Sequence, residues 1–194
     1  STKASSSPTS NIFCLTAIAH TLRRCDEFAQ YARAKQALAT DRNLAEFRVM
    51  KDICVKPCAS APHHGLLRFG THRSRCALGK GGVTKIKKEG DGKTPIGRYR
   101  LRRIWYRPDR IMRPQSPLPI AKIHQKSGWC DDVRSNLYNV PIERPSAARH
   151  ERLWRHDRLY DVFFELGMND APPEKGAGSA VFLHLSTFPP GCLA

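Results

Sequence analysis

Near the end of the chain stands the stretch Val181-Phe182-Leu183-His184-Leu185-Ser186-Thr187-Phe188-Pro189-Pro190-Gly191-Cys192. Successive side chains of an extended segment point to opposite faces, so Phe182 and His184 share one face and the flanking leucines share the other. A short run that is apolar on both faces is typical of an interior strand of a sheet. The stretch therefore predicts a buried strand that carries a histidine, followed by a tight turn and a cysteine.

His184 and Cys192 form a candidate catalytic pair. A Pro-Pro-Gly turn between them can reverse the chain over a few residues. An imidazole close to a thiol can take its proton and leave a thiolate, which is the reactive nucleophile. Gly191 would let backbone N–H groups approach a substrate oxygen, as an oxyanion hole requires. From this stretch alone, two ordinary core residues remain the alternative interpretation.

The length and net charge of the chain limit its domain organisation and its possible partners. The 194 residues suffice for one domain with an appended arm. Lys and Arg outnumber Asp and Glu by 33 to 17, which gives a formal net charge of +16. Such a charge predicts anionic surroundings, namely nucleic acid, an anionic membrane face or an anionic cell-wall polymer. Charge by itself does not choose among these partners.

The cysteines and the apolar runs predict neither a metal site nor a membrane span. Seven cysteines are an odd number without regular spacing, so no disulfide framework is expected. Cys54 and Cys58 precede His63 and His64, but these gaps match no common zinc site. No apolar run reaches the roughly 18 residues of a transmembrane helix, and no signal peptide is visible in this chain.

The patterning changes near Met50. Residues 1–49 are Ser-rich at first and then show a helical period, which predicts an N-terminal extension, disordered and then helical, of unknown function. From residue 50 onward, short β-type runs alternate with Gly and Pro turns. Residues 50–194 are therefore predicted to form a mainly β domain, a β-sandwich or a partly closed barrel.

Residues 106–158 are rich in Pro, Arg and Trp and show little periodicity, which predicts a long folded insertion in this domain. Around the start of this segment, a basic stretch is interleaved with aromatic residues, as in proteins that track a nucleic-acid backbone. A basic nucleic-acid-binding module is therefore the main non-enzyme alternative. Its arginines are Arg98, Arg100, Arg102, Arg103 and Arg107.

Several fragments, taken in order, carry a family resemblance. They are Cys76-Ala77-Leu78-Gly79, Lys88-Glu89-Gly90-Asp91-Gly92-Lys93-Thr94-Pro95-Ile96-Gly97-Arg98-Tyr99, Trp129-Cys130-Asp131-Asp132, Tyr138-Asn139, Leu159-Tyr160-Asp161 and Gly178-Ser179-Ala180-Val181-Phe182-Leu183-His184-Leu185. The ordered set resembles the YkuD-like L,D-transpeptidase catalytic domain, in the ErfK/YbiS/YcfS/YnhG branch. The resemblance runs roughly from Met50 to Cys192.

The resemblance implies a fold of the L,D-transpeptidase type and a cysteine acyltransferase that cross-links peptidoglycan stem peptides in the bacterial cell envelope. Cys192 would be the nucleophile and His184 its general base, with Gly191 shaping the oxyanion site. No cofactor and no metal are implied, and an anionic wall polymer is a further candidate partner. The candidate residues of the substrate cleft are Thr94, Pro95, Gly97, Tyr160 and Asn169.

The end of the chain departs from the family pattern. Family members place a longer loop between the His and the Gly-Cys pair and continue well past the Cys, whereas this chain ends at Ala194. The C-terminus is therefore predicted to be atypical and truncated, with weak or absent catalysis, because a terminal nucleophile is free to fray. An inactive relative of the transpeptidases is the corresponding alternative.

Overall fold

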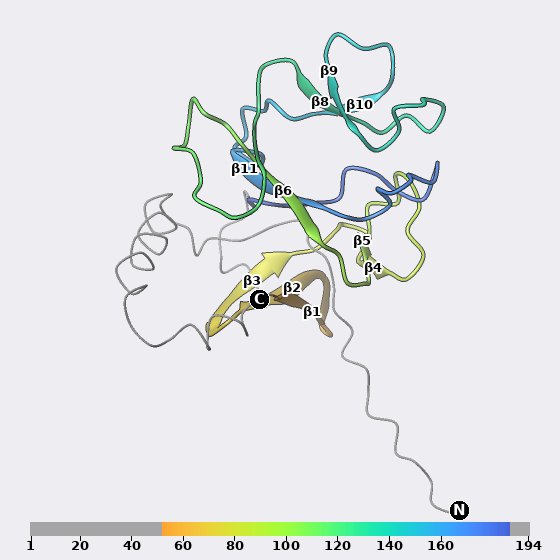
Figure 1. Cartoon of the computed structure of the whole chain (residues 1–194). Helices are drawn as coiled ribbons and strands as arrows, with labels where there is room; N and C mark the ends of the chain where they lie inside the picture. The colour runs from red at the N-terminus through yellow and green to blue at the C-terminus, as the bar shows by residue number, and fades with distance from the viewer. Residues whose placement is uncertain (1–51, 187–194) are drawn as a thin grey trace, which may run out of the picture.

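The computed structural model describes residues 52–186, and in this range it contains twelve β-strands and no helix. Figure 1 shows how most of these strands are arranged in space. The strands are β1 Ile53–Cys58, β2 Ala61–Phe69, β3 His72–Ala77, β4 Val83–Thr84, β5 Thr94–Pro95, β6 Leu101–Tyr106, β7 Ile120–Lys122, β8 Ser127–Cys130, β9 Pro141–Glu143, β10 His150–Arg152, β11 Val162–Leu166 and β12 Phe182–His184. The mainly β prediction is confirmed. The helical extension predicted for residues 1–49 lies outside the described residues.

The first three strands form an antiparallel sheet in the order β1-β2-β3. Gly70 has a φ of 59° in the tight turn between β2 and β3, a conformation that glycine adopts without steric cost. Strand alternation then sorts the side chains: Val55 and Leu67 are buried, whereas Arg68 and Arg75 are exposed. One face of this sheet therefore packs on the core and the other is basic.

The strand with His184 belongs to a four-stranded sheet in the order β12-β11-β6-β7. Among the described residues β12 lies at one edge of this sheet, whereas the sequence predicted an interior strand. The reason lies in the packing: Phe182 belongs to one hydrophobic cluster and Leu183 to another. An edge strand wedged between two clusters is apolar on both faces, as an interior strand is.

Residues 106–158 contribute side chains to the core, so an insertion is not supported. Strands β8, β9 and β10 form an antiparallel sheet in the order β10-β8-β9. Ile123, Trp129 and Leu153 from this segment are buried in the same cluster as Phe163 of β11. The lack of periodicity reflects strands of only three or four residues, which are too short to show one.

The core consists of two clusters of different chemistry. The aliphatic cluster contains Val55, Leu67, Cys76, Leu78, Leu166 and Leu183. The aromatic cluster contains Trp105, Ile123, Trp129, Leu153, Phe163 and Phe182. The four sheets of residues 52–186 do not close into a barrel, so the sandwich, rather than the partly closed barrel, fits this arrangement. Within this range no helix has the length and apolarity that a membrane span requires.

Candidate active site

His184 ends strand β12, where it pairs with Phe163 of β11. Its Nδ1 lies 2.7 Å from the carbonyl oxygen of Leu185. Because a carbonyl can only accept, Nδ1 carries the proton and donates it in this bond. The neutral imidazole is therefore held in one tautomer, in which Nε2 is free to accept a proton.

The surroundings of His184 favour its neutral form. Burial lowers the pKa of the imidazole below its ordinary value of 6.5, and the Arg155 guanidinium lowers it further. The Leu185 carbonyl and the Asp157 carboxylate act in the opposite direction but do not cancel these effects. A neutral imidazole is the form that can act as a base. The site thus supplies a base, with a defined tautomer, near neutral pH.

Tyr160 lies directly against the imidazole. Its ring packs edge-to-face on His184 with 5.2 Å between the ring centroids, and it also contacts Phe163 and Phe182. Burial raises the pKa of its hydroxyl above the ordinary value of 10.0, and the Glu151 carboxylate raises it further. Tyr160 is thus a protonated aromatic wall beside the histidine. Of the sequence-predicted site residues, these two are brought into contact.

Arg155 connects this wall to two carboxylates. Its guanidinium carbon lies 5.4 Å from the centroid of the Tyr160 ring. It also forms ion pairs with Glu151 and Asp157, at 2.9 Å and 2.5 Å. Sequence reasoning assigned these three charged residues no part in the site, because they lie in the Arg-rich segment without a recognisable motif. Through Arg155, these charged side chains lie next to Tyr160, which contacts His184.

Thr94, Pro95 and Gly97 belong to another part of the molecule. Thr94 and Pro95 are buried in strand β5, which pairs with β4 rather than with the sheet of His184. Thr94 Oγ1 accepts a hydrogen bond of 2.8 Å from the backbone N–H of Gly79. A Cβ added to Gly97 would come within 2.6 Å of the Tyr99 hydroxyl. These contacts describe a packed turn, and the predicted role of the three residues in the substrate cleft stays a prediction.

Asn169 closes the loop that precedes β12. Its side chain accepts a hydrogen bond of 2.7 Å from the N–H of Glu174 and donates bonds of 2.8 Å and 2.9 Å to the carbonyls of Glu174 and Gly178. Asn169 itself has a φ of 53°, in the left-handed region that Asn tolerates better than most residues. Through these three hydrogen bonds, Asn169 stabilises the conformation of residues 169–178.

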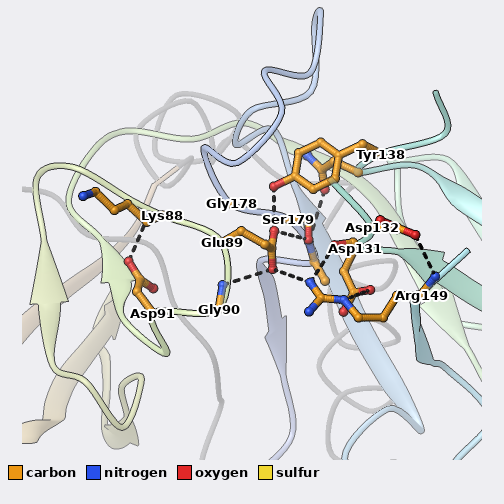
Figure 2. Close-up of polar contacts among 12 residues, drawn as sticks. Lys88, Glu89, Gly90, Asp91, Asp131, Asp132, Tyr138, Arg149, Gly178 and Ser179 are labelled. Carbon is orange, nitrogen blue, oxygen red and sulfur yellow. Dashed lines mark hydrogen bonds and ion pairs between the residues drawn. The ribbon is translucent and has the colours of Figure 1, made fainter. Parts of the chain in front are cut away.

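A polar cluster around Glu89 lies beside this loop (Figure 2). Glu89 Oε2 accepts hydrogen bonds from the hydroxyls of Tyr138, at 2.6 Å, and Ser179, at 2.7 Å. Glu89 Oε1 lies 3.8 Å from the guanidinium of Arg149. Sequence reasoning quoted Glu89 and Ser179 within family-like fragments but assigned them no role. The only available signal was that they fall in two of those fragments.

The side-chain amide of Asn139 forms a second set of hydrogen bonds in this region, one of them to the chain just before β12. Its Oδ1 accepts from the indole N–H of Trp129, at 2.9 Å, and from the backbone N–H of Ala180, at 3.1 Å. Its Nδ2 donates to the carbonyls of Met168 and Asn169. Donors meet the oxygen and acceptors meet the nitrogen, so the orientation of the amide is defined. The sequence reasoning missed this role of a buried amide.

Gly191 and Cys192 lie outside the described residues, so their predicted roles remain predictions. Within residues 52–186, no group of three or more His, Cys, Asp or Glu side chains is arranged to hold a metal ion. Cys54, Cys58, Cys76 and Cys130 are free thiols in this part of the chain.

Comparison with known proteins adds one match. The family model of the YkuD L,D-transpeptidase catalytic domain matches residues 63–189. No curated protein and no solved structure matches the chain. The matched range begins in β2 and includes β12, so it covers the aromatic cluster, the aliphatic cluster apart from Val55, and His184.

Proposed function

Because the chain belongs to the YkuD family of L,D-transpeptidase catalytic domains, we propose that it is a cysteine acyltransferase that cross-links peptidoglycan stem peptides. The Cys192 thiolate attacks the carbonyl carbon of the diamino acid that precedes D-alanine in a stem. The C–N bond to D-alanine then breaks, and the imidazolium of His184 gives its proton to the departing amine. An amine of a second stem then attacks the thioester: the new amide C–N bond forms, the C–S bond breaks to release the thiolate, and the neutral imidazole of His184 takes the proton of the amine.

The geometry of His184 carries this proposal. The hydrogen bond from Nδ1 to the Leu185 carbonyl leaves Nε2 as the proton acceptor, and burial keeps the imidazole neutral. Both conditions are needed for a histidine that activates a thiol. Gly191, next to the proposed nucleophile, would let a backbone N–H face the developing oxyanion. Tyr160 is proposed to line the substrate cleft because it contacts the imidazole.

Intact-mass analysis of the full chain after incubation with a carbapenem tests the proposal. Carbapenems resemble the acyl donor, so one molecule of drug should add to Cys192. Cys192→Ala should abolish the adduct and His184→Gln should slow its formation strongly. Cys54→Ala is the matched control, because Cys54 is another free thiol, half-buried in β1, and this variant should be acylated as the unaltered chain is. A missing adduct, or one on another cysteine, would reject the proposed chemistry and favour an inactive relative.

The domain boundary follows the same reasoning. We propose that residues 50–194 form the catalytic domain and residues 1–49 a separate extension. Strand β1 begins at Ile53, and the family match lies entirely within residues 50–194. Limited proteolysis should therefore first cut near residue 50 and leave a resistant fragment. First cuts within residues 115–150 would contradict this boundary.

The nucleic-acid alternative loses support in the basic aromatic stretch. Arg102 pairs with Asp170 at 2.7 Å, and Arg107 is buried, pairs with Asp109 at 2.7 Å and lies over the ring of Trp154. Side chains engaged within the fold are not available to track a phosphate backbone. We propose that the protein acts in the bacterial cell envelope, because its proposed substrate occurs there.

The outer face of the β1-β2-β3 sheet is the proposed contact with an anionic wall polymer. The strand register places Leu66 between Lys56 and Arg75, and Arg68 opposite Arg73. These four cations are exposed, and no carboxylate among the described residues pairs with them. Opposite charge favours an anionic polymer along this face.

Sedimentation with purified cell walls tests this contact. A variant with Arg68→Glu and Arg73→Glu should be retained less than the unaltered chain, and the difference should shrink as salt rises. The same two substitutions should not change acylation by a carbapenem. Equal retention of both proteins, or tight DNA binding without wall retention, would reject the assignment of this face.

A further inference from the structure

The backbone that leads into strand β12 has an unusual conformation. Gly178 has a φ of 96° and Ala180 a φ of 50°, in the left-handed region that a residue with a Cβ rarely adopts. We call residues 178–180 the lead-in segment. Strand β12 follows after one residue and ends at His184. The conformation of the lead-in segment therefore sets the direction from which the histidine strand enters its sheet.

The strand itself has little to hold it. Strand β12 has three paired positions, all with β11, and within residues 52–186 it has no strand on its other side. An edge strand of three residues is a weak element. Contacts outside the ladder are needed to keep its register and its position.

Each residue of the lead-in segment is held by a different side chain. Asn169 donates to the carbonyl of Gly178 at 2.9 Å, and Asn139 accepts from the N–H of Ala180 at 3.1 Å. Between them, the Ser179 hydroxyl donates to Glu89 at 2.7 Å (Figure 2). Glu89 is the one anionic partner of the three. A hydrogen bond to a charged acceptor is stronger than one between neutral groups.

Glu89 is itself held from several directions, so it can serve as a fixed point. Its carboxylate accepts from the Tyr138 hydroxyl at 2.6 Å and lies 3.8 Å from the Arg149 guanidinium. Its own backbone N–H donates to the carbonyl of Gly176 at 2.8 Å, which ties the same loop to the chain just before the lead-in segment. A residue anchored in this way can hold Ser179 without moving with it.

We propose that Glu89 is a positioning residue for His184: through Ser179 it holds the lead-in segment, so that β12 presents the imidazole at one place and in one tautomer. Glu89 acts through the strand and does not touch the reacting atoms. The inference rests on the proposed role of His184 as the base. Because Leu185 is the next residue, the bond that fixes the tautomer depends on the local backbone conformation at the end of β12, and a change of that conformation weakens it. Misplacement of a catalytic group by about 1 Å costs on the order of a hundredfold in rate.

Two readouts on the full chain separate this inference from the proposed function. The first is the ¹⁵N NMR signal of the His184 ring, assigned by its loss in His184→Gln, which reports the tautomer whether or not Cys192 reacts. The second is the rate of acylation by a carbapenem. If the unaltered chain shows the Nδ1–H tautomer but no acylation, the proposed function fails while the positioning of His184 can still be tested by NMR.

Two variants change the hydrogen bond between Ser179 and Glu89, one at the acceptor and one at the donor. Glu89→Gln keeps the shape of the side chain without the charge, and Ser179→Ala removes only the hydroxyl on the strand side, which protects the test if the first variant does not fold. Both should convert the single His184 tautomer signal to a mixture and slow acylation at least tenfold. The matched control is Glu143→Gln, the same substitution on an exposed carboxylate of β9, which should change neither readout.

The outcome that overturns the inference is equally definite. If Ser179→Ala folds and keeps both the His184 tautomer signal and the acylation rate of the unaltered chain, Glu89 does not position the histidine. The same holds if Glu143→Gln alters the two readouts as much as Glu89→Gln does, because the effect is then one of charge alone.

Discussion

The sheet of β1, β2 and β3 and the strand of His184 are held together in opposite ways. The first is built from consecutive strands with six paired positions on each side of β2, and an aliphatic face covers the core. Strand β12 has three paired positions, and its lead-in segment is held by side chains from residues 89, 139 and 169. The comparison shows that local pairing forms the scaffold, whereas long-range polar contacts position the candidate base.

The largest effect is expected in the aromatic cluster that supports β12. Phe163 is fully buried. The centroid of its ring lies 4.4 Å from that of Phe182 and 6.0 Å from that of Trp105. Phe163→Ala should lower the free energy of unfolding by about 3–5 kcal/mol, measured by guanidinium denaturation. Leu66→Ala, on the exposed face of β2, is the control and should change it by less than about 0.5 kcal/mol. Similar losses in both would mean that the aromatic cluster is not the main support.

The next prediction compares a buried amide that has four hydrogen-bond partners with a buried hydroxyl that has no partner within residues 52–186. Asn139→Leu would leave the N–H groups of Trp129 and Ala180 without their acceptor, at about 1–3 kcal/mol for each unsatisfied group. Ser74 Oγ in β3 is buried, and no partner among the described residues bonds to it. Ser74→Ala should therefore be neutral or stabilising. Thermal and urea unfolding of the two variants measure the contrast, and a costly Ser74→Ala would contradict it.

A pH effect is expected at His184. Because burial lowers its pKa in the folded protein below the ordinary 6.5, the unfolded chain binds a proton first as the pH falls. The stabilisation is complete above pH 6.5 and is lost as the pH falls from there through the lowered folded pKa. In His184→Gln this part of the pH dependence should disappear, as measured by urea unfolding between pH 8 and pH 4. Identical pH profiles for the two proteins would show that His184 is not buried in its neutral form.

The smallest expected effect is that of an Ala-to-Gly substitution, which should change stability in opposite directions in the lead-in segment and in the sheet of β1, β2 and β3. Ala180 has a φ of 50°, where a Cβ costs about 1–2 kcal/mol, so Ala180→Gly should leave stability unchanged or raise it by up to about 1 kcal/mol. Ala77 lies in regular strand β3, where Gly is less favourable than Ala by about 0.5–1 kcal/mol. Ala77→Gly should therefore be destabilising. Calorimetric melting of both variants gives the signs, and a loss on Ala180→Gly would argue against strain in the lead-in segment.

The sequence was most informative where the physical signal is local. Short β-type runs between Gly and Pro turns predicted a mainly β domain from residue 50 onward, and the structure contains β1 to β12 between residues 53 and 184. Among the described residues β12 lies at an edge rather than in the interior of its sheet. Apolarity on both faces does not distinguish a central strand from an edge strand between two clusters. The supposed insertion over 106–158 hid core residues such as Trp129 and Leu153, because its strands are too short to show a period.

By itself the sequence determined the mainly β class, the YkuD family and His184 as the candidate base, because strand alternation and ordered fragments are properties of the chain read along its length. The tertiary structure decided the tautomer of His184 and its contact with Tyr160. It also decided the anchoring of the lead-in segment by Glu89, which lies 90 positions from Ser179. The physical reason is that a hydrogen bond depends on distance and direction in space. Residues so far apart in the chain acquire both only when the sheets pack.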